Sequence, residues 1–416
     1  MRIVIYALSS IFLLIGCKGQ VKIPSESVDV SNIIDLAAGF DNIHSVRLSE
    51  IADSVTFIPF ETTSNSLMGV GQNHLISFSP SYIFYWGDCF DWNGKHWGKI
   101  VKNGQGPYEE LDGGYLVFKD NHFYSEGSKF IEYDITGQPT GKVRNLFAAR
   151  EFGANDFLRQ GVVFTNIDEN FMVYNYPNTI YFIDKNFETV ASRNVFLTDS
   201  LTSNFMGHSA NKFITYYKDM VLFYNFVNDT IFRVLDTGLE PRWIVSFDHP
   251  ARFPTQVMLK HKLLWRGLMN AARVGASLDD TEVVKLEENK HRVLAAYETE
   301  SHVFFFLSEN IGLAEVRNKI PPDPSIIYYD KNTGKSIRVK GKGFVDDLLG
   351  MDFFYPQLGI FEQKMITYIW PYELLEYIDQ CKEKGRDVNP QLLVLSKTID
   401  PEDNPILILA HLKKNI

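Results

Sequence analysis

The sequence predicts an all-β fold, a six-bladed β-propeller with short helical insertions, preceded by a lipoprotein signal peptide and a tether. Three observations support this prediction: short runs of alternating apolar and polar residues, a turn pattern repeated at an offset of 43 residues, and an apolar leader that ends in a cysteine. The 416 residues are 45% hydrophobic and 14% aromatic. That composition can bury a large core and excludes a disordered chain.

The charge balance argues against two classes of partner. The chain has 41 Lys and Arg against 51 Asp and Glu, a formal net charge of −10. Nucleic-acid binding rewards clustered cations, and so does general adhesion to anionic lipid. We therefore expect no nucleic-acid partner.

Residues 1–16 read as an export signal. Arg2 precedes an apolar stretch over residues 3–15, which is shorter than the roughly 20 residues that a membrane-spanning helix needs. The stretch ends in Leu-Ile-Gly-Cys, which resembles a bacterial lipobox, so Cys17 is the predicted lipidation site. The alternative is an ordinary signal peptide with an accidental cysteine.

Residues 17–43 form the predicted lipidated N-terminus and flexible tether, and residues 44–416 the propeller. Acyl chains on Cys17 would hold the protein to a membrane. Lys18, rather than Asp, follows the cysteine, and no acidic run comes next. These features favour an outer-membrane lipoprotein that faces the periplasm, with the cell surface as the alternative.

Two further cysteines, Cys89 and Cys381, lie 292 residues apart. An exported chain could pair them, but no disulfide framework is visible. Buried, free thiols are the favoured interpretation.

The body of the chain carries strand signals. Short runs rich in Val, Ile, Phe and Tyr alternate with polar residues, and no helix separates each pair, which disfavours a doubly wound sheet. The clearest runs are residues 54–60, 75–85, 161–174, 213–226 and 303–307.

An internal repeat indicates the architecture. Residues 90–100 align without a gap with residues 133–143: an aromatic residue, Asp, Gly three residues later, a second Gly four residues further, then Lys and an aliphatic residue. This order describes a hairpin turn between two strands. Weaker copies occur at residues 181–186, 229–234 and 327–335.

A period near 43 residues with four short strands is typical of a propeller blade. Residues 254–274 and 371–384 instead show helical spacing, and subtracting them leaves room for six blades. We expect the strand around residues 55–60 to pair with residues 406–409 in the last blade, so that the ring closes without an unpaired edge.

Five segments, the lipobox included, resemble the six-bladed β-propeller lipoproteins of Bacteroides and relatives. Beyond the lipobox they are residues 55–62, 104–109, 229–245 and 403–409. Glu110 stands where that family has an aromatic residue. The resemblance implies the fold, but no activity, because the biochemical role of the family is undefined.

The glycine-rich segment at Gly104, Gly106, Pro107 and Glu109 is predicted to be a structural turn between blades. A phosphate-binding loop would continue with Lys and Ser or Thr into a helix, and this segment does not. The ten His show no metal-ligand spacing. We therefore predict no catalytic residue, no metal ligand and no cofactor, while residues from distant blades could still converge on the axis.

Trp92 and Trp97, in the first hairpin, are the candidates for stacking on a ligand; packing in the core or at the rim is the alternative. The sequence thus favours a membrane-anchored, non-catalytic binding or scaffolding protein of the cell envelope, whose ligand is a protein partner or a glycan. The alternative function is a metal-assisted hydrolase or lyase with its site in the central funnel.

Overall fold

The computed structural model describes residues 32–69, 76–110, 115–126, 129–145, 162–167, 169–175, 179–194, 214–224, 229–253, 289–309 and 323–414. The chain divides into the units Met1–Asn32 and Ile33–Ile416, and the second unit contains every element described below. The predicted signal peptide, Cys17 and the helix expected at residues 254–274 lie outside the described residues.

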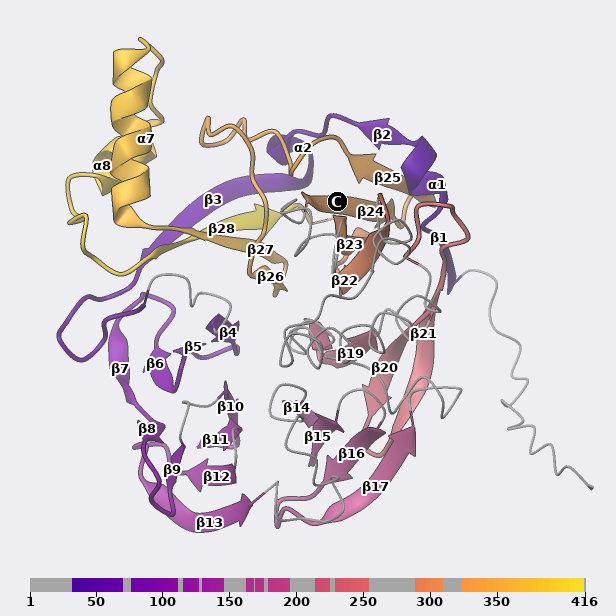
Figure 1. Cartoon of the computed structure of the whole chain (residues 1–416), viewed down its shortest axis with the longest axis vertical. Helices are drawn as coiled ribbons and strands as arrows, with labels where there is room; N and C mark the ends of the chain where they lie inside the picture. The colour runs from indigo at the N-terminus through magenta and orange to yellow at the C-terminus, as the bar shows by residue number, and fades with distance from the viewer. Residues whose placement is uncertain are drawn as a thin grey trace, which may run out of the picture. The chain divides into compact units, whose positions relative to one another are not determined.

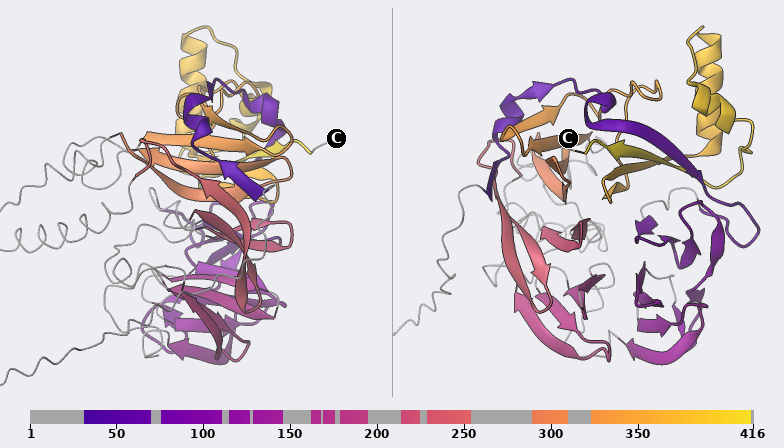
Figure 2. Two further views of the ribbon diagram at one scale, coloured as in Figure 1. Left: turned by 90° about the vertical axis from the view of Figure 1, so that its right-hand side faces the viewer. Right: turned by 180° about the vertical axis from the view of Figure 1, so that it is seen from behind.

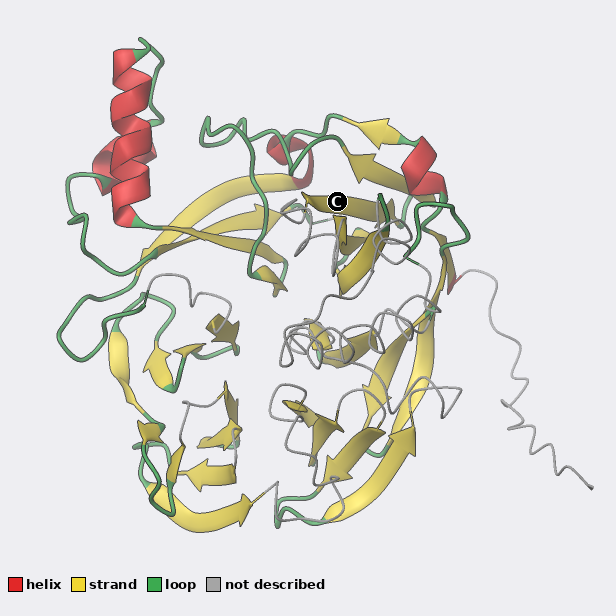
Figure 3. Cartoon of the chain, viewed as in Figure 1, coloured by secondary structure: helices red, strands yellow, loops and turns green. Residues whose placement is uncertain are grey.

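Six sheets of four or five strands follow one another around a ring within Ile33–Ile416, which confirms the six-bladed propeller (Figures 1 and 3). From the innermost strand outwards, blade 1 has β4 (Ile76–Phe78), β5 (Ile83–Tyr85), β6 (Asp88–Phe90) and β7 (His96–Lys99); blade 2 has β10 (Tyr115–Lys119), β11 (His122–Glu126), β12 (Lys129–Tyr133) and β13 (Pro139–Asn145); blade 3 has β14 (Val162–Ile167), β15 (Asn170–Asn175), β16 (Thr179–Ile183) and β17 (Thr189–Asn194).

Blades 4, 5 and 6 each include an N-terminal strand. Blade 4 has β18 (Ile214–Tyr217), β19 (Met220–Tyr224), β20 (Thr230–Leu235), β21 (Gly238–Ser246) and β1 (Ile33–Asp35); blade 5 has β22 (His291–Glu298), β23 (His302–Glu309), β24 (Asp323–Asp330), β25 (Lys335–Val339) and β2 (Ile43–His44); blade 6 has β26 (Gly359–Phe361), β27 (Lys364–Ile369), β28 (Ile406–Leu412) and β3 (Ala52–Pro59). A separate pair, β8 (Lys102–Asn103) and β9 (Glu109–Glu110), lies between blades 1 and 2 in the chain.

The repeated Asp-to-Gly pattern is the turn between the third and fourth strands of a blade. In blade 1, Asp91 Oδ1 accepts hydrogen bonds from the backbone N–H groups of Asn93 and Lys95, at 2.8 and 3.0 Å. Asp134 and Asp184 make the same two bonds in blades 2 and 3. A carboxylate that satisfies two turn amides is why Asp recurs at this position.

Three predicted runs are each two strands joined by a short turn. Residues 75–85, 161–174 and 213–226 contain β4 with β5, β14 with β15, and β18 with β19. The alternating pattern continues across a tight turn, so the sequence gives no visible break there. Lys218, in one of these turns, has a φ of +52°, a left-handed conformation that a polar residue at a tight turn adopts at a cost.

The N-terminal residues 33–59, here called the strap, run along the outer edges of blades 4, 5 and 6. They comprise β1, α1 (Ala38–Asp41), β2, α2 (Leu48–Ile51) and β3. Ile34 and Leu36 are fully buried, and Phe40 is 8% exposed. The strap therefore begins upstream of residue 44, where the sequence placed the start of the propeller, because three apolar side chains seat it against the blades.

The ring closes as expected, since β3 pairs antiparallel with β28 from Ile406↔Pro59 to Leu412↔Ala52. The N-terminal strand thus becomes the outermost strand of the blade that the C-terminus completes. The strand that follows β3 in the chain is β4 of blade 1, so the pairing of β3 with β28 links blade 6 to blade 1 and closes the ring.

The predicted helix at residues 371–384 is α7 (Pro371–Glu383), which is followed by α8 (Pro390–Leu395) and links β27 to β28. Leu374, Ile378 and Cys381 form its buried face. Cys381 and Cys89 are both buried and free, as favoured from the sequence. Among the described residues, no helix combines the length and the apolar character needed to cross a membrane.

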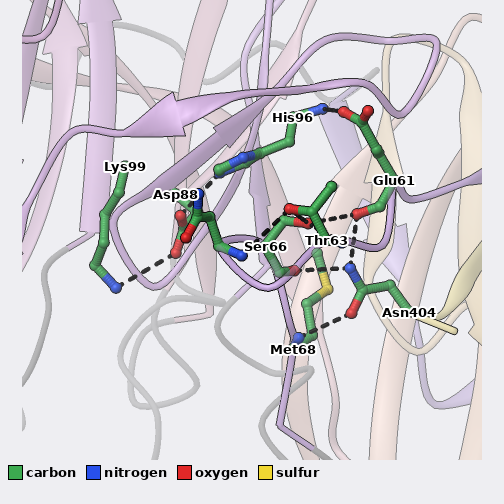
Figure 4. Close-up of polar contacts among 9 residues, drawn as sticks. Glu61, Thr63, Ser66, Met68, Asp88, His96, Lys99 and Asn404 are labelled. Atoms are coloured by element: carbon green, nitrogen blue, oxygen red, sulfur yellow. Dashed lines mark hydrogen bonds and ion pairs between the residues drawn. The ribbon is translucent and has the colours of Figure 1, made fainter. Parts of the chain in front are cut away.

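The side chain of Asn404 holds the ring closure together (Figure 4). Its Oδ1 accepts a hydrogen bond from the Met68 N–H at 2.8 Å, and its Nδ2 donates to the carbonyls of Glu61 at 2.8 Å and Ser66 at 2.7 Å. Asn404 is 2% exposed, so these groups have no ready access to water. The hydrogen bonds of Asn404 therefore form a network that fixes the loop after β3 onto the start of β28.

We predict that Asn404→Ala lowers the free energy of unfolding by about 3 kcal/mol, because it leaves buried backbone groups without partners. The matched control is Asn93→Ala, at an exposed turn position, which should change stability by less than about 0.5 kcal/mol. Chemical denaturation measures both. A loss for Asn404→Ala no larger than that of the control would contradict the role of this side chain.

Candidate functional site

The turns between first and second strands and between third and fourth strands share one end of the blades, here called the short-turn face. It lies on the side where the C-terminus is marked in the left panel of Figure 2. In an antiparallel blade these two turns must lie at the same end, so this face collects side chains from every blade.

Contacts at the short-turn face join every neighbouring pair of blades. The partners are Tyr82 with Phe118, Lys119 with the carbonyl of Asn170, the Asn170 amide with Asp236, Arg242 and Trp243 with Glu298, the Glu300 N–H with Gln363, and Trp92 with Phe361. Residues at this face therefore hold the ring together in addition to lining any site there.

The structure places the two candidate tryptophans on opposite sides of blade 1. Trp92 stacks on Phe361 of blade 6 with ring centroids 6.0 Å apart, while Trp97 lies against Phe123 of blade 2 at 5.7 Å. Trp97 is 43% exposed. The two rings therefore pack against different neighbouring blades.

Trp92 belongs to an aromatic cluster formed by Phe78, Trp92, Tyr216 and Phe361. Trp92 also stacks on Phe78 at 5.8 Å and 22°, and its indole N–H donates to the Ser79 carbonyl at 3.0 Å. Tyr216, from blade 4, meets Phe361 edge-on at 6.0 Å. The innermost strands of blades 1, 4 and 6 thus bring three rings to one place, and the turn of blade 1 adds the fourth.

A lysine accompanies the aromatic cluster. The Lys364 ammonium lies 5.2 Å from the centre of the Trp92 ring and 3.5 Å from the Glu362 carboxylate. Phe78, Trp92, Tyr216 and Lys364 are half-buried, whereas Phe361 is buried. The cluster therefore combines apolar ring surface with one cation, a composition suited to a flat ligand that also carries hydrogen-bonding groups.

A buried carboxylate joins blades 4 and 5. The Glu298 side chain is fully buried and accepts hydrogen bonds from Arg242 Nη2 at 2.9 Å, Trp243 Nε1 at 2.9 Å and Lys331 Nζ at 2.7 Å. Burial alone would raise the pKa of Glu298, but the bonds from Arg242 and the charge of Lys331 lower it below its ordinary value. This fully bonded carboxylate is an interblade clamp, and its oxygens are committed to these donors.

A histidine–aspartate pair lies near the ring closure. His96 Nε2 is 3.0 Å from Asp88 Oδ1, and the His96 backbone N–H donates to Glu61 at 2.8 Å. The nearby Ser66 hydroxyl instead donates to the Glu61 carbonyl at 2.7 Å. In Figure 4 the Ser66 hydroxyl contacts Thr63 and the Glu61 carbonyl, whereas the His96 ring contacts Asp88. The group is therefore a structural network rather than a Ser-His-Asp triad.

The predicted turn motif lies in the connection between β8 and β9. The Gly106 N–H donates to Glu109 Oε2 at 2.9 Å, and a Cβ on Gly104 would come within 1.9 Å of the same oxygen. Lys129 of blade 2 donates to the Gly106 carbonyl and, at 3.0 Å, to that of Glu109. The Glu109 carboxylate thus fills the space that a phosphate would need above this turn.

In the part of the chain that the structure describes, no group of three or more His, Cys, Asp or Glu side chains is placed to hold a metal ion. Sequence reasoning identified Trp92 but missed Tyr216, Phe361 and Lys364. No local pattern could have shown them, because they are ordinary strand residues until the blades are assembled.

We predict that the two tryptophans differ in their contribution to stability. Trp92→Ala should cost about 2 kcal/mol, because it removes two ring stacks and a hydrogen bond, whereas Trp97→Ala should cost less than about 1 kcal/mol at its exposed position. Thermal unfolding of the two variants checks this order. Equal losses, or a larger loss for Trp97→Ala, would show that the packing described here is wrong.

The comparisons with known proteins agree with this architecture. The sequence profile of a domain of unknown function, DUF4934, matches residues 31–411. None of the curated proteins matches the chain. The structure of a "Putative exported protein" from Bacteroides fragilis is 16% identical, covers 92% of this chain and 99% of its own, and superposes with a TM-score of 0.60.

Two other solved structures are much less similar. The yeast (S. cerevisiae) assembly of Dbp5 with Nup159 and Gle1 matches 81% of this chain and 75% of its own at 8% identity and a TM-score of 0.35. BamB from Moraxella catarrhalis matches 68% and 66% at 11% identity and a TM-score of 0.30. The profile match spans nearly the whole described unit, and the chain therefore belongs to the DUF4934 family of six-bladed β-propellers.

Proposed function

We propose that this chain is an exported, membrane-anchored binding propeller that uses the aromatic cluster at its short-turn face to hold a ligand without reacting with it. Export is supported by the leader sequence and by the description of the Bacteroides fragilis neighbour as exported. Anchoring is supported by the lipobox that ends at Cys17.

The aromatic cluster is the observation that carries the binding proposal. Its rings come from blades 1, 4 and 6 and remain half-buried at Phe78, Trp92 and Tyr216. Ring faces and edges of this kind stack on the apolar face of a sugar or on an aliphatic or aromatic peptide side chain. Lys364, at 5.2 Å from the Trp92 ring, adds a hydrogen-bond donor beside them.

A glycan is the ligand class that this composition fits best. A sugar ring offers an apolar face to an aromatic side chain and hydroxyl groups to a lysine at its edge, and the cluster provides both within one region. A peptide ligand would use the rings but would not require the lysine. This difference separates the two classes experimentally.

We predict that Cys17 is acylated. Cells that express the wild-type protein should incorporate radiolabelled palmitate into it, and Cys17→Ala should abolish the label and release the protein from the membrane fraction. Cys89→Ala is the matched control, because this cysteine is fully buried and should not affect labelling. Equal labelling of wild type and Cys17→Ala would contradict the anchor.

We predict that a member of a panel of defined oligosaccharides raises the thermal unfolding temperature of the wild-type protein. Tyr216→Leu and Lys364→Met should remove the shift, because the first removes an aromatic ring of the cluster and the second removes its cation. Leu and Met are chosen because they still fill most of the space of the original side chains. Trp97→Leu, at the exposed ring on the other side of blade 1, should retain it.

Two outcomes would contradict the proposal. A shift that depends on Trp97 and not on Tyr216 would place binding outside the cluster. Stabilisation by a divalent metal ion with metal-dependent turnover of an oligosaccharide would favour the alternative function, a metal-assisted hydrolase or lyase.

A further inference from the structure

An aromatic ring of the strap packs against two histidines. Phe40 of α1 is 8% exposed, and its ring stacks on Phe247 at a centroid distance of 5.3 Å and on His249 at 4.7 Å. The His291 ring meets Phe40 edge-on at 5.1 Å. His249 follows β21 of blade 4, and His291 begins β22 of blade 5. Phe40 therefore connects the strap to imidazole rings from two neighbouring blades.

The hydrogen bond of His291 identifies its protonation state. The residue is 5% exposed, and its Nε2 lies 3.0 Å from Nη2 of Arg338 in β25. A guanidinium group can only donate a hydrogen bond, so Nε2 must accept it, and the proton of the neutral ring is assigned to Nδ1. Nδ1 has no hydrogen-bond partner among the described residues. A second proton would therefore have to enter at Nε2, where Arg338 already donates.

Groups of both signs surround His291. They are Arg338 of β25, Glu309 of β23, His249 and Arg252 of the segment after β21, and the exposed Asp41 of α1. The Arg252 guanidinium pairs with Asp229 at 2.5 Å. Glu309 Oε2 lies 3.6 Å from Nε2 of the His291 ring, beyond the usual range of a hydrogen bond. The closest charge to Nε2 in this group is therefore the cation of Arg338.

Acidic pH acts against this environment of His291. Burial, followed by the charges of Arg338 and His249, lowers the pKa of His291 from 6.5 to about 4. Because the pKa in the folded protein lies below that of the unfolded chain, the folded state prefers the neutral ring. The contribution of His291 to stability is therefore complete above the unfolded pKa of 6.5 and is lost progressively as the pH falls towards 4.

Arg338 connects the state of His291 to the strap. Its guanidinium lies 5.0 Å from the centre of the Phe40 ring, and its backbone N–H donates to the Asn42 carbonyl at 2.9 Å. β2 also pairs with β25 at this residue, through Ile43↔Arg338. A proton on His291 would remove an acceptor of the guanidinium and place two cations 3.0 Å apart. The Arg338 side chain would then leave its place over Phe40.

We propose that His291 and Arg338 form a pH-sensitive switch that releases residues 33–44 of the strap when His291 becomes protonated. The ring of blades stays closed, because β3 remains paired with β28 through seven residue pairs. The switch acts where the strap meets blades 4 and 5, and it does not depend on the proposed glycan function.

Release would change how far the propeller reaches from its anchor. Residues 33–44 follow Cys17 in the sequence, and an extended segment of this length spans about 40 Å. Acidic pH would add this length to the connection between the lipid and the ring. This consequence depends on the anchor proposed above, whereas the switch itself does not.

Native-state hydrogen exchange of the purified full-length protein tests the switch, once rates are corrected for the intrinsic pH dependence of exchange. The reporters are the Leu36 N–H, bonded to the Ser246 carbonyl at 2.8 Å, and the Arg338 N–H. Lowering the pH from about 7.5 to about 5 should raise their opening equilibrium constants about tenfold. The amides of β28 should change by less than about twofold, because the ring stays closed.

His291→Gln should abolish this pH dependence, because the Gln carbonyl can still accept a hydrogen bond from Arg338 but does not titrate. His44→Gln is the matched control, at the exposed histidine of β2, and should retain the full pH dependence. A second measurement needs no variant. The imidazole ¹⁵N chemical shifts of the wild-type protein at neutral pH should identify the Nδ1–H tautomer of His291, and this ring should titrate below about pH 5.

Several outcomes would overturn the switch. Equal opening constants of the strap amides at both pH values would show that nothing is released, and an equal rise in β28 would show general acid unfolding. A pH dependence that persists in His291→Gln, or that is lost in His44→Gln, would assign the effect to another group. An Nε2–H tautomer, or titration of His291 at its ordinary pKa, would contradict the hydrogen bond with Arg338.

Discussion

Closure of the ring by the two ends of the chain is the constraint on which the rest of the structure depends. A blade buries its faces only against its neighbours, so an open row of six blades would expose two apolar faces. β3 pairs with β28 through seven residue pairs, and Asn404 fixes the following loop with three side-chain hydrogen bonds. Segments more than 300 residues apart in the sequence must therefore meet before the two terminal blades are fully packed.

The candidate site is a consequence of this closure. Phe78, Tyr216 and Phe361 belong to the innermost strands of blades 1, 4 and 6, and Trp92 reaches Phe361 across the interface at which the ring closes. The cluster therefore exists only in the closed ring. The Glu298 clamp between blades 4 and 5 shows the complementary case, in which a buried charge is held by three donors and serves assembly rather than chemistry.

The sequence allowed the prediction of what is local or periodic. The alternation of apolar and polar residues predicted the strands. The repeated Asp-to-Gly turn indicated the length of a blade, because in each copy one carboxylate satisfies two nearby backbone amides. Of the strap, β3 was predicted, but β1 and β2 were missed because they have three and two residues, too few for a periodic signal. The aromatic cluster was missed, apart from Trp92, because Tyr216 and Phe361 lie 145 residues apart and only the tertiary structure brings them together.

Native-state hydrogen exchange tests most directly whether closure makes the blades one cooperative unit. The slowest amides of β28, in the closing blade, should be compared with those of β16, in blade 3 on the other side of the ring. The account predicts the same free energy of opening for both strands, because neither can open without breaking the ring. A free energy for β16 that is lower by more than about 1 kcal/mol, reached while β28 stays protected, would show that blades open independently and would contradict it.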